Sequence, residues 1–243
     1  MSKQLLIYDE LTPLSSERHR DWSVKTDGHY SFARTANSVP LTAVEFPLAA
    51  REFPIVFAES NDEIIPLALM GVRPEQNLFI ADDGTTSADY VPAFIRRYPF
   101  VFASSDEGKR LTLCIDEKYD GCNQDGRGER LFDADGEQTT YLKGILKFQS
   151  DFQAHYARTR QFCQKLKELD LIEAMGARFK GPDGNPIGLT GFSSVDRKKL
   201  HALEGDKLEE LSRTGELELA YVQLQSLANF PSLMSLAARA EAN

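Results

Sequence analysis

The sequence predicts an α+β fold. We expect a pseudo-symmetric, mostly antiparallel β-sheet or partly closed barrel, then a long amphipathic helix, a hairpin and C-terminal helices. The first observation behind this is an internal repeat: "AREFPIVFAES" at 50–60 and "IRRYPFVFASS" at 95–105 share six of eleven residues. The second is a change at Thr139, where apolar residues begin to recur at the three- and four-residue steps of a helix. A chain of 243 residues is long enough to bury a sizeable core.

The residues before the first repeat predict strands and turns with short helical pieces. "QLLIYDEL", at 4–11, is apolar enough for a first strand. "SSERHRDW", at 15–22, predicts a turn or one short helix, and "SVPLTAVEF", at 38–46, predicts an extended segment.

Each repeat, at about 45–60 and 90–105, predicts a helical turn, a proline, a buried strand, a polar turn and a returning strand. In the first copy the helical turn covers 48–52, and Pro54 disfavours helical geometry at Phe53. Ile55 to Ala58 is a continuous apolar run, which is typical of a strand buried on both faces. Because matching ββ units commonly pack about a local two-fold axis, we expect each to close the other's sheet edge.

The second half predicts helices interrupted by one hairpin. An apolar stripe indicates a long amphipathic helix that follows a threonine N-cap, and its members are Leu142, Ile145, Gln149, Phe152, Tyr156, Thr159, Cys163 and Leu166. A hairpin with a Gly-Pro-Asp-Gly-Asn-Pro tip is expected at 177–192, and helices at 195–203, 206–213, 215–227 and after Pro231. We therefore divide the chain into a β-rich region, 1–136, and a helix-rich region, 137–243, packed on it. A single continuous domain remains open.

Composition restricts the partners and the compartment. The net charge of -9, from 28 basic and 37 acidic residues, argues against nucleic acid and against anionic lipid. No apolar run is long enough to span a membrane, and Asp9 and Glu10 interrupt any signal-peptide core. The three cysteines lack CxxC spacing, so we expect a reducing, cytoplasmic location.

No motif names a reaction. The four histidines lack HxH, HExxH or HxD spacing, and no nucleophile elbow, P-loop or dinucleotide-binding glycine motif occurs. We predict no metal site and no cofactor. The Asp-Gly pairs, which end at Gly84, Gly121, Gly126, Gly136 and Gly184, fail the spacing of a calcium loop and predict turns.

Three arginines are the candidate ligand-binding residues. Arg51 and Arg96 occupy equivalent places in the repeats and could form a paired anion clamp, with Arg97 beside them. Glu45 and His19 are the side chains that could join them in a site. The alternative is structural, and commoner: each guanidinium stacks on its neighbouring aromatic and pairs with a carboxylate, such as that of Glu45, Glu52 or Asp106.

Several strings together resemble the bacterial SapC-like family over essentially the whole chain: "VPLTAVEFPLAAREFPIVFAES", "YVPAFIRRYPFVFA", "LCIDE", "LFDADGEQTTYLKGIL" and "GELELAYVQLQSL". The family name implies a link to surface-layer proteins. The resemblance also implies that the protein occurs together with outer-membrane uptake receptors and flavin-dependent halogenases. It supplies no catalytic residues. The surface-layer label fits poorly with a chain that shows no export signal and no lattice-type repeats.

These observations leave three hypotheses. The first is a soluble, non-enzymatic accessory protein that binds a peptide or protein partner. The second is an enzyme with a small-molecule or anion site at the repeat interface. The third is a surface-layer component, associated with the cell surface and able to assemble into sheets. A homodimer is left open.

Overall fold

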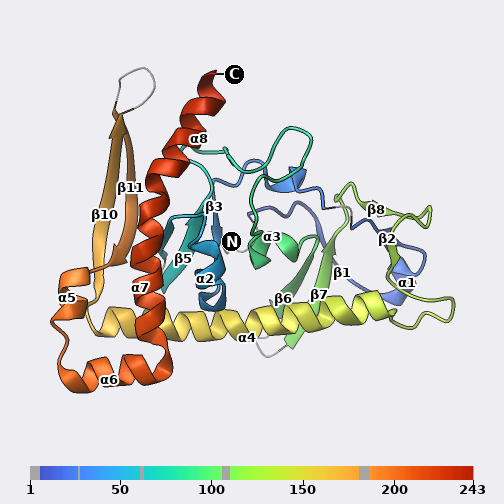
Figure 1. Ribbon diagram of the computed structural model, residues 1–243. Helices are drawn as coiled ribbons and strands as arrows, with labels where there is room; N and C mark the ends of the chain where they lie inside the picture. The colour runs from blue at the N-terminus through green and yellow to red at the C-terminus, as the bar shows by residue number, and fades with distance from the viewer. Residues whose placement is uncertain (1–5, 27, 61–62, 106–109, 181–185, 243) are drawn as a thin grey trace.

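The computed structural model describes residues 6–26, 28–60, 63–105, 110–180 and 186–242. They form an α+β protein with three antiparallel sheets and the long helix α4, Thr140–Glu168. Figure 1 shows α4 lying along the hairpins of both repeats, and α4 contacts a strand of each hairpin. The predicted fold class and the predicted long helix are therefore confirmed.

The start of the chain differs from the expectation. The first strand is β1, Leu11–Pro13, and the segment from Leu6 to Glu10 is not a strand. The reason is a buried carboxylate: Asp116 accepts hydrogen bonds from the backbone N–H groups of Asp9, at 2.7 Å, and Glu10, at 3.1 Å. Residues 4 and 5 lie outside the described residues. The predicted short helix is α1, Ser16–His19, and it is followed by β2, Ser23–Val24.

The two repeats have the same local structure. The first comprises α2, Phe46–Ala49, then β4, Ile55–Ser60, and β5, Glu63–Leu69. The second comprises α3, Ala93–Arg96, then β6, Phe100–Ser105, and β7, Arg110–Asp116. The first helical turn begins earlier than predicted, because a proline (Pro47) fits the opening turn of a helix. The turns predicted within the two hairpins fall partly on residues 61–62 and 106–109, which lie outside the described residues.

The expectation that the repeats share one pseudo-symmetric sheet or barrel is wrong. The hairpin β4–β5 belongs to a five-stranded sheet of order β10-β11-β4-β5-β3, whereas β6–β7 belongs to a three-stranded sheet of order β1-β7-β6. Strands from outside the repeats pair with three of the four repeat strands: β11, Pro186–Val195, pairs with β4, β3, Ser38–Pro40, pairs with β5, and β1 pairs with β7. Strand β10, Ile172–Lys180, extends the five-stranded sheet beyond β11. A small third sheet pairs β2 with β8, Cys122–Asn123, and β9, Glu129–Arg130.

Strand β4 is buried on both faces, as its continuous apolar run predicts. Ile55, Val56 and Phe57 are all 0% exposed. Ile55 and Phe57 lie in the main core, and Val56 lies in a second cluster with Phe230. Phe230 begins α8, Phe230–Ala242, so a C-terminal helix covers the outer face of this strand.

Two buried glutamines make the same contact in the two repeats. Gln223 donates a hydrogen bond to the backbone oxygen of Ile55 at 2.8 Å, and Gln149 donates to that of Phe100 at 2.8 Å. Ile55 and Phe100 are equivalent repeat positions, each opening the first strand of its hairpin. Gln223 comes from α7, Glu216–Ser226, and Gln149 comes from α4. Different helices therefore cover the same position of the two repeats.

The second half follows the predicted order. Thr139 caps α4 by accepting from the Leu142 N–H at 3.2 Å, and the predicted stripe contributes most of the helix's buried residues. The hairpin and helices follow with small shifts of boundary; the remaining helices are α5, Arg197–His201, and α6, Gly205–Thr214. Most of the predicted hairpin tip, 181–185, lies outside the described residues, as does the pair Asp183-Gly184. Gly84, Gly126 and Gly136 have positive φ, as expected of Asp-Gly turns.

Within the described residues, no helix has the length and hydrophobicity needed to cross a membrane. The same residues contain no group of three or more His, Cys, Asp or Glu side chains arranged to hold a metal ion.

Candidate ligand-binding groove

An open hollow of about 680 Å³ lies where the two repeats begin. We call it the repeat groove and define it by its lining: Thr42, Val44, Glu45, Leu48, Asp89, Tyr90, Val91, Ala93, Arg96, Phe148, Asp151, Phe152 and His155. The first repeat contributes the 3₁₀ turn η3, Ala43–Glu45, and α2. The second contributes α3 and the residues before it, and α4 forms the remaining wall.

Glu45 is a structural link between the two repeats. Its side chain is buried, and Oε2 accepts hydrogen bonds from the Thr42 N–H and hydroxyl, each at 2.8 Å. Oε1 accepts from the Tyr90 hydroxyl at 2.8 Å and from the Ala93 N–H, at the start of α3, at 2.7 Å. Both oxygens are thus engaged, and the carboxylate fixes η3 against α3 rather than projecting into the groove as a base.

Arg96 lines the groove as a pre-positioned cation. Its Nε–H donates to the Val91 backbone oxygen at 2.9 Å, which fixes the guanidinium beside α3. Its Cζ lies 5.9 Å from the ring centre of Tyr90 and 5.4 Å from that of Phe148. Throughout the described ranges, no carboxylate oxygen lies within 4.0 Å of Arg96, although twelve other ion pairs form. The guanidinium contacts aromatic rings, although those of Tyr90 and Phe148 rather than the ring predicted beside it in sequence. Of the predicted carboxylate partners, Glu45 and Glu52 do not pair with it, and Asp106 lies outside the described residues.

Helix α4 sets the position of the opposite wall. The Thr159 hydroxyl accepts from the Ala43 N–H at 2.7 Å and donates to the His155 backbone oxygen at 2.7 Å. This joins α4 to η3 directly below the groove. Asp151, also on α4, forms an exposed ion pair with Lys147 at 2.7 Å.

The groove also exposes apolar surface. Val44 is 58% exposed and Leu48 is 48% exposed, and both are among the few large apolar side chains with that much solvent contact. Phe148 adds an aromatic ring from α4. Tyr90 is half-buried, and burial together with the Glu45 carboxylate raises the pKa of its phenol. The hydroxyl therefore stays protonated at neutral pH and keeps donating to Glu45.

The other predicted site residues lie elsewhere. Arg97 is 1% exposed, and its guanidinium carbon lies 4.4 Å from the ring centre of Phe94 and 4.7 Å from that of Phe152. Burial lowers the pKa of this guanidinium, against the hydrogen bond that it makes with Tyr8. Arg97 is thus part of the core.

His19 is fully buried in α1. It packs edge-on against Trp22, with 5.1 Å between ring centres, and its Nε2 lies 3.0 Å from Glu117 Oε1. Arg51 is exposed and does not line the repeat groove. The structure therefore brings together Glu45 and Arg96, and not Arg51, Arg97 or His19.

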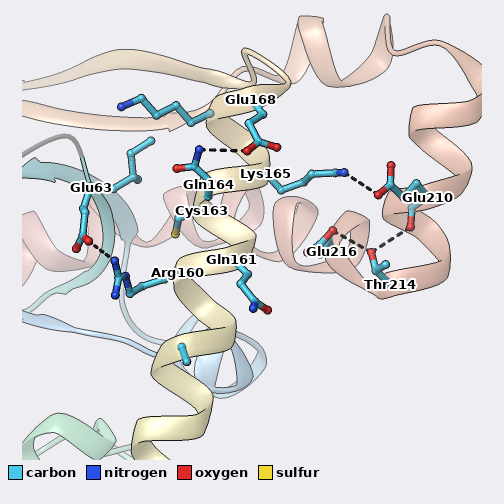
Figure 2. Close-up of a pocket in the computed structure, with 13 residues that line it drawn as sticks. Glu63, Arg160, Gln161, Cys163, Gln164, Lys165, Glu168, Glu210, Thr214 and Glu216 are labelled. Carbon is cyan, nitrogen blue, oxygen red and sulfur yellow. Dashed lines mark hydrogen bonds and ion pairs between the residues drawn. The ribbon is translucent and has the colours of Figure 1, made fainter. Parts of the chain in front are cut away.

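A second hollow, of about 640 Å³, lies between α4 and the C-terminal helices, and Figure 2 shows its side chains bonding to one another. Arg160 pairs with Glu63, and Lys165 pairs with Glu210 at 2.6 Å. Glu168 accepts from Gln164 at 3.1 Å. The two ion pairs tie α4 to β5 and α6, which is a structural role. The repeat groove differs because, among the residues that the structure describes, Arg96 pairs with no carboxylate.

The sequence did not single out Tyr90, Leu48 or Phe148. A longer comparison of the repeats could have found the first, because aligning Pro47 with Pro92 places Glu45 opposite Tyr90. Phe148 lies beside the predicted stripe and is only partly buried. The exposure of Leu48 has no sequence signal. Burial raises the pKa of the Cys122 and Cys163 thiols to about 12 and also raises that of Cys114, which disfavours their reactive thiolate forms.

The fold and the groove define an α+β protein with an open, partly apolar groove that carries an arginine. The chain belongs to the SapC family, whose model matches residues 14–233. This confirms the resemblance seen in the repeat segments. No curated protein and no solved structure matches the chain.

Proposed function

We propose that this SapC family protein is a non-enzymatic accessory protein that binds a peptide or protein partner in the repeat groove. The observation that carries the proposal is the position of Arg96, a pre-positioned cation in the groove that the exposed side chains of Val44 and Leu48 also line. Arginine and aromatic side chains are enriched among the residues that dominate binding energy at protein interfaces. Covering Val44 and Leu48 with a partner adds a hydrophobic contribution of about 25 cal/mol per Å² buried.

The same geometry argues against catalysis in this groove by the residues first considered. Glu45 uses both carboxylate oxygens in four hydrogen bonds, and His19 is buried in α1. A general base needs a free acceptor within reach of its substrate. Glu45 and His19 do not meet that requirement here, so neither supplies the base that was first considered.

A peptide-display selection tests the proposal. Libraries with a free N-terminus and, separately, with a free C-terminus are selected against the whole protein. The expected result is enriched peptides whose binding is lost in Leu48→Asp, because the new carboxylate both removes apolar contact and faces the ligand. Leu111→Asp is the matched control, since Leu111 is also 48% exposed but lies on β7 outside the groove. Peptides that bind both variants equally, or no enrichment from either library, would contradict the proposal.

The family resemblance suggests which whole proteins to test first. Outer-membrane uptake receptors and flavin-dependent halogenases are proposed as partners, and co-purification with the wild type and with Leu48→Asp tests each. A complex that survives Leu48→Asp does not use the groove.

A small-molecule or anion site is the second candidate. The groove volume of about 680 Å³ supports it, because ligand pockets are commonly a few hundred to a thousand Å³. A native mass spectrum of the freshly purified protein checks this directly. A stoichiometric adduct that disappears in Arg96→Gln favours the small molecule, and a bare protein of the expected mass favours the partner-binding function.

A further inference from the structure

We infer that the repeat groove recognises the C-terminal carboxylate of a polypeptide whose last side chain is apolar, with Arg96 binding the carboxylate. This inference rests on the proposed function and names its ligand. The first evidence is that the guanidinium of Arg96 is held in one orientation. Nε–H is committed to Val91, and the rings of Tyr90 and Phe148 flank the group at 5.9 Å and 5.4 Å, which restricts its rotation. A fixed guanidinium matches the planar geometry of a carboxylate and loses little side-chain entropy on binding.

The surrounding charges indicate that the ligand carries a single negative group. The oxygens of Glu45 accept from other donors and Asp151 pairs with Lys147, so neither carboxylate forms an ion pair with Arg96. Asp89, Asp151 and the net charge of -9 nevertheless disfavour a ligand with several carboxylates. One carboxylate fits the groove, whereas an acidic run does not.

The apolar side chains decide which carboxylate this is. Val44 and Leu48 expose apolar surface in the same groove as Arg96. The last residue of a polypeptide carries its carboxylate and its side chain on one Cα, so both groups reach the groove together. In an internal Asp or Glu the side chain is itself the acid, and a different residue must supply the apolar contact. The C-terminus therefore satisfies both features with one residue.

The test uses three defined probes and nuclear magnetic resonance of the whole protein. The probes are N-acetyl-Gly-Ser-Gly-Ala-Phe with a free carboxylate, the same peptide as its C-terminal amide, and 3-phenylpropionate. Titrations follow the backbone amides of groove residues and the Arg96 Nε–H resonance, which is assigned by its loss in Arg96→Gln. The free acid is expected to bind at least about tenfold more tightly than the amide, as expected for a charge-assisted pair. It is also expected to bind more tightly than 3-phenylpropionate.

Two arginine variants test whether the preference for the free acid over the amide depends on Arg96. Arg96→Gln should reduce the preference for acid over amide to near unity, whereas Arg51→Gln should keep it, because Arg51 occupies the equivalent repeat position outside the groove. The inference is overturned if the amide binds as well as the acid, or if the preference for the acid survives Arg96→Gln. It is also overturned if 3-phenylpropionate binds as tightly as the peptide, or if the acid perturbs no groove residue. Enrichment of peptides from the free N-terminal library together with any of these results leaves the proposed function standing and rejects only the C-terminal recognition.

Discussion

Tyr90 and Glu45 occupy equivalent positions in the two repeats and bond to each other, the Tyr90 hydroxyl donating to Glu45 Oε1 at 2.8 Å. The internal repeat therefore brings its two copies together at their first residues, although their hairpins belong to different sheets. The repeat groove opens beside this contact. Its shape consequently depends on the Glu45 hydrogen bonds, which hold η3 against α3.

The Glu45–Tyr90 bond should show measurable coupling in stability. Tyr90→Phe removes one hydrogen bond and is expected to lower the free energy of unfolding by about 1 kcal/mol. Glu45→Gln replaces one acceptor oxygen with an amide that faces N–H or O–H donors, so we expect a loss of about 2–3 kcal/mol. Urea unfolding of both variants and of the double variant measures the coupling. Strictly additive losses would show that the two side chains do not interact in solution.

Arg96 and Arg97 are adjacent in sequence but should contribute very differently to the free energy of unfolding. Arg97→Ala empties a fully buried position among Phe94, Phe152 and Tyr8, and we expect a destabilisation of about 3 kcal/mol or more. Arg96→Ala removes an exposed side chain and should cost less than about 1 kcal/mol. Thermal and urea unfolding of the two variants gives the comparison. Equal losses would contradict the assignment of one arginine to the core and the other to the groove.

The two buried glutamines should contribute unequally to stability. Gln223 bridges two strands, because it donates to the Ile55 oxygen and accepts from the Val195 N–H at 3.1 Å. Gln223→Leu is expected to cost about 2–4 kcal/mol, since two buried backbone groups lose a partner. Gln149→Leu should cost only about 1 kcal/mol, because the Phe100 oxygen still accepts from the Tyr8 hydroxyl at 2.9 Å. Urea denaturation of the two variants checks the order, and a larger loss for Gln149→Leu would overturn it.

Acid should weaken the contact between α1 and the turn after β7. Glu117 accepts from Arg18 Nη2 at 2.6 Å and lies 3.0 Å from His19, and the Arg18 hydrogen bonds, more than His19, lower the pKa of Glu117 below its usual value of 4.5. Because the unfolded chain takes up this proton more readily, the stabilisation is present above pH 4.5 and is lost as the pH falls through the folded-state pKa.

The matching experiment measures the free energy of unfolding from neutral pH to below pH 4 in the wild type and in Glu117→Gln, an interval that spans about one unit either side of the ordinary glutamate pKa. The difference between the two proteins should be largest near neutrality and shrink in acid. Arg18→Ala removes the main cause of the shift and should lose most of the same pH-dependent difference. A difference that stays constant with pH would contradict the pairing.

Local patterns in the sequence were enough to predict most elements. The apolar stripe that starts after Thr139 predicted α4, and the continuous run from Ile55 predicted a strand buried on both faces. The repeat predicted two similar ββ units with a helical turn before each. It could not predict how they assemble, because any strand with an open edge is a possible partner. Strands β1, β3 and β11 compete for those edges.

The candidate site was predictable only in part. Glu45 and Arg96 were named from the repeat, and they do lie in one groove, whereas Arg51, Arg97 and His19 lie elsewhere. Arg96 and Arg97 are neighbours in sequence and of one residue type, so nothing local separates them. Their environments differ because the two side chains leave the end of α3 in different directions. Arg96 points toward solvent beside Phe148, and Arg97 points into the core beside Phe152.

The sequence by itself determined the repeat, the long helix, the order of elements and the family to which the chain belongs. Hydrophobic period and proline placement act over a few residues, so they can be recognised without the fold. The tertiary structure alone decided the three sheets, the burial of Arg97 and the exposed cation of the groove. Those properties depend on contacts between residues far apart in the chain. Burial and hydrogen bonding at these contacts determine which of several similar side chains is buried and which lines the groove.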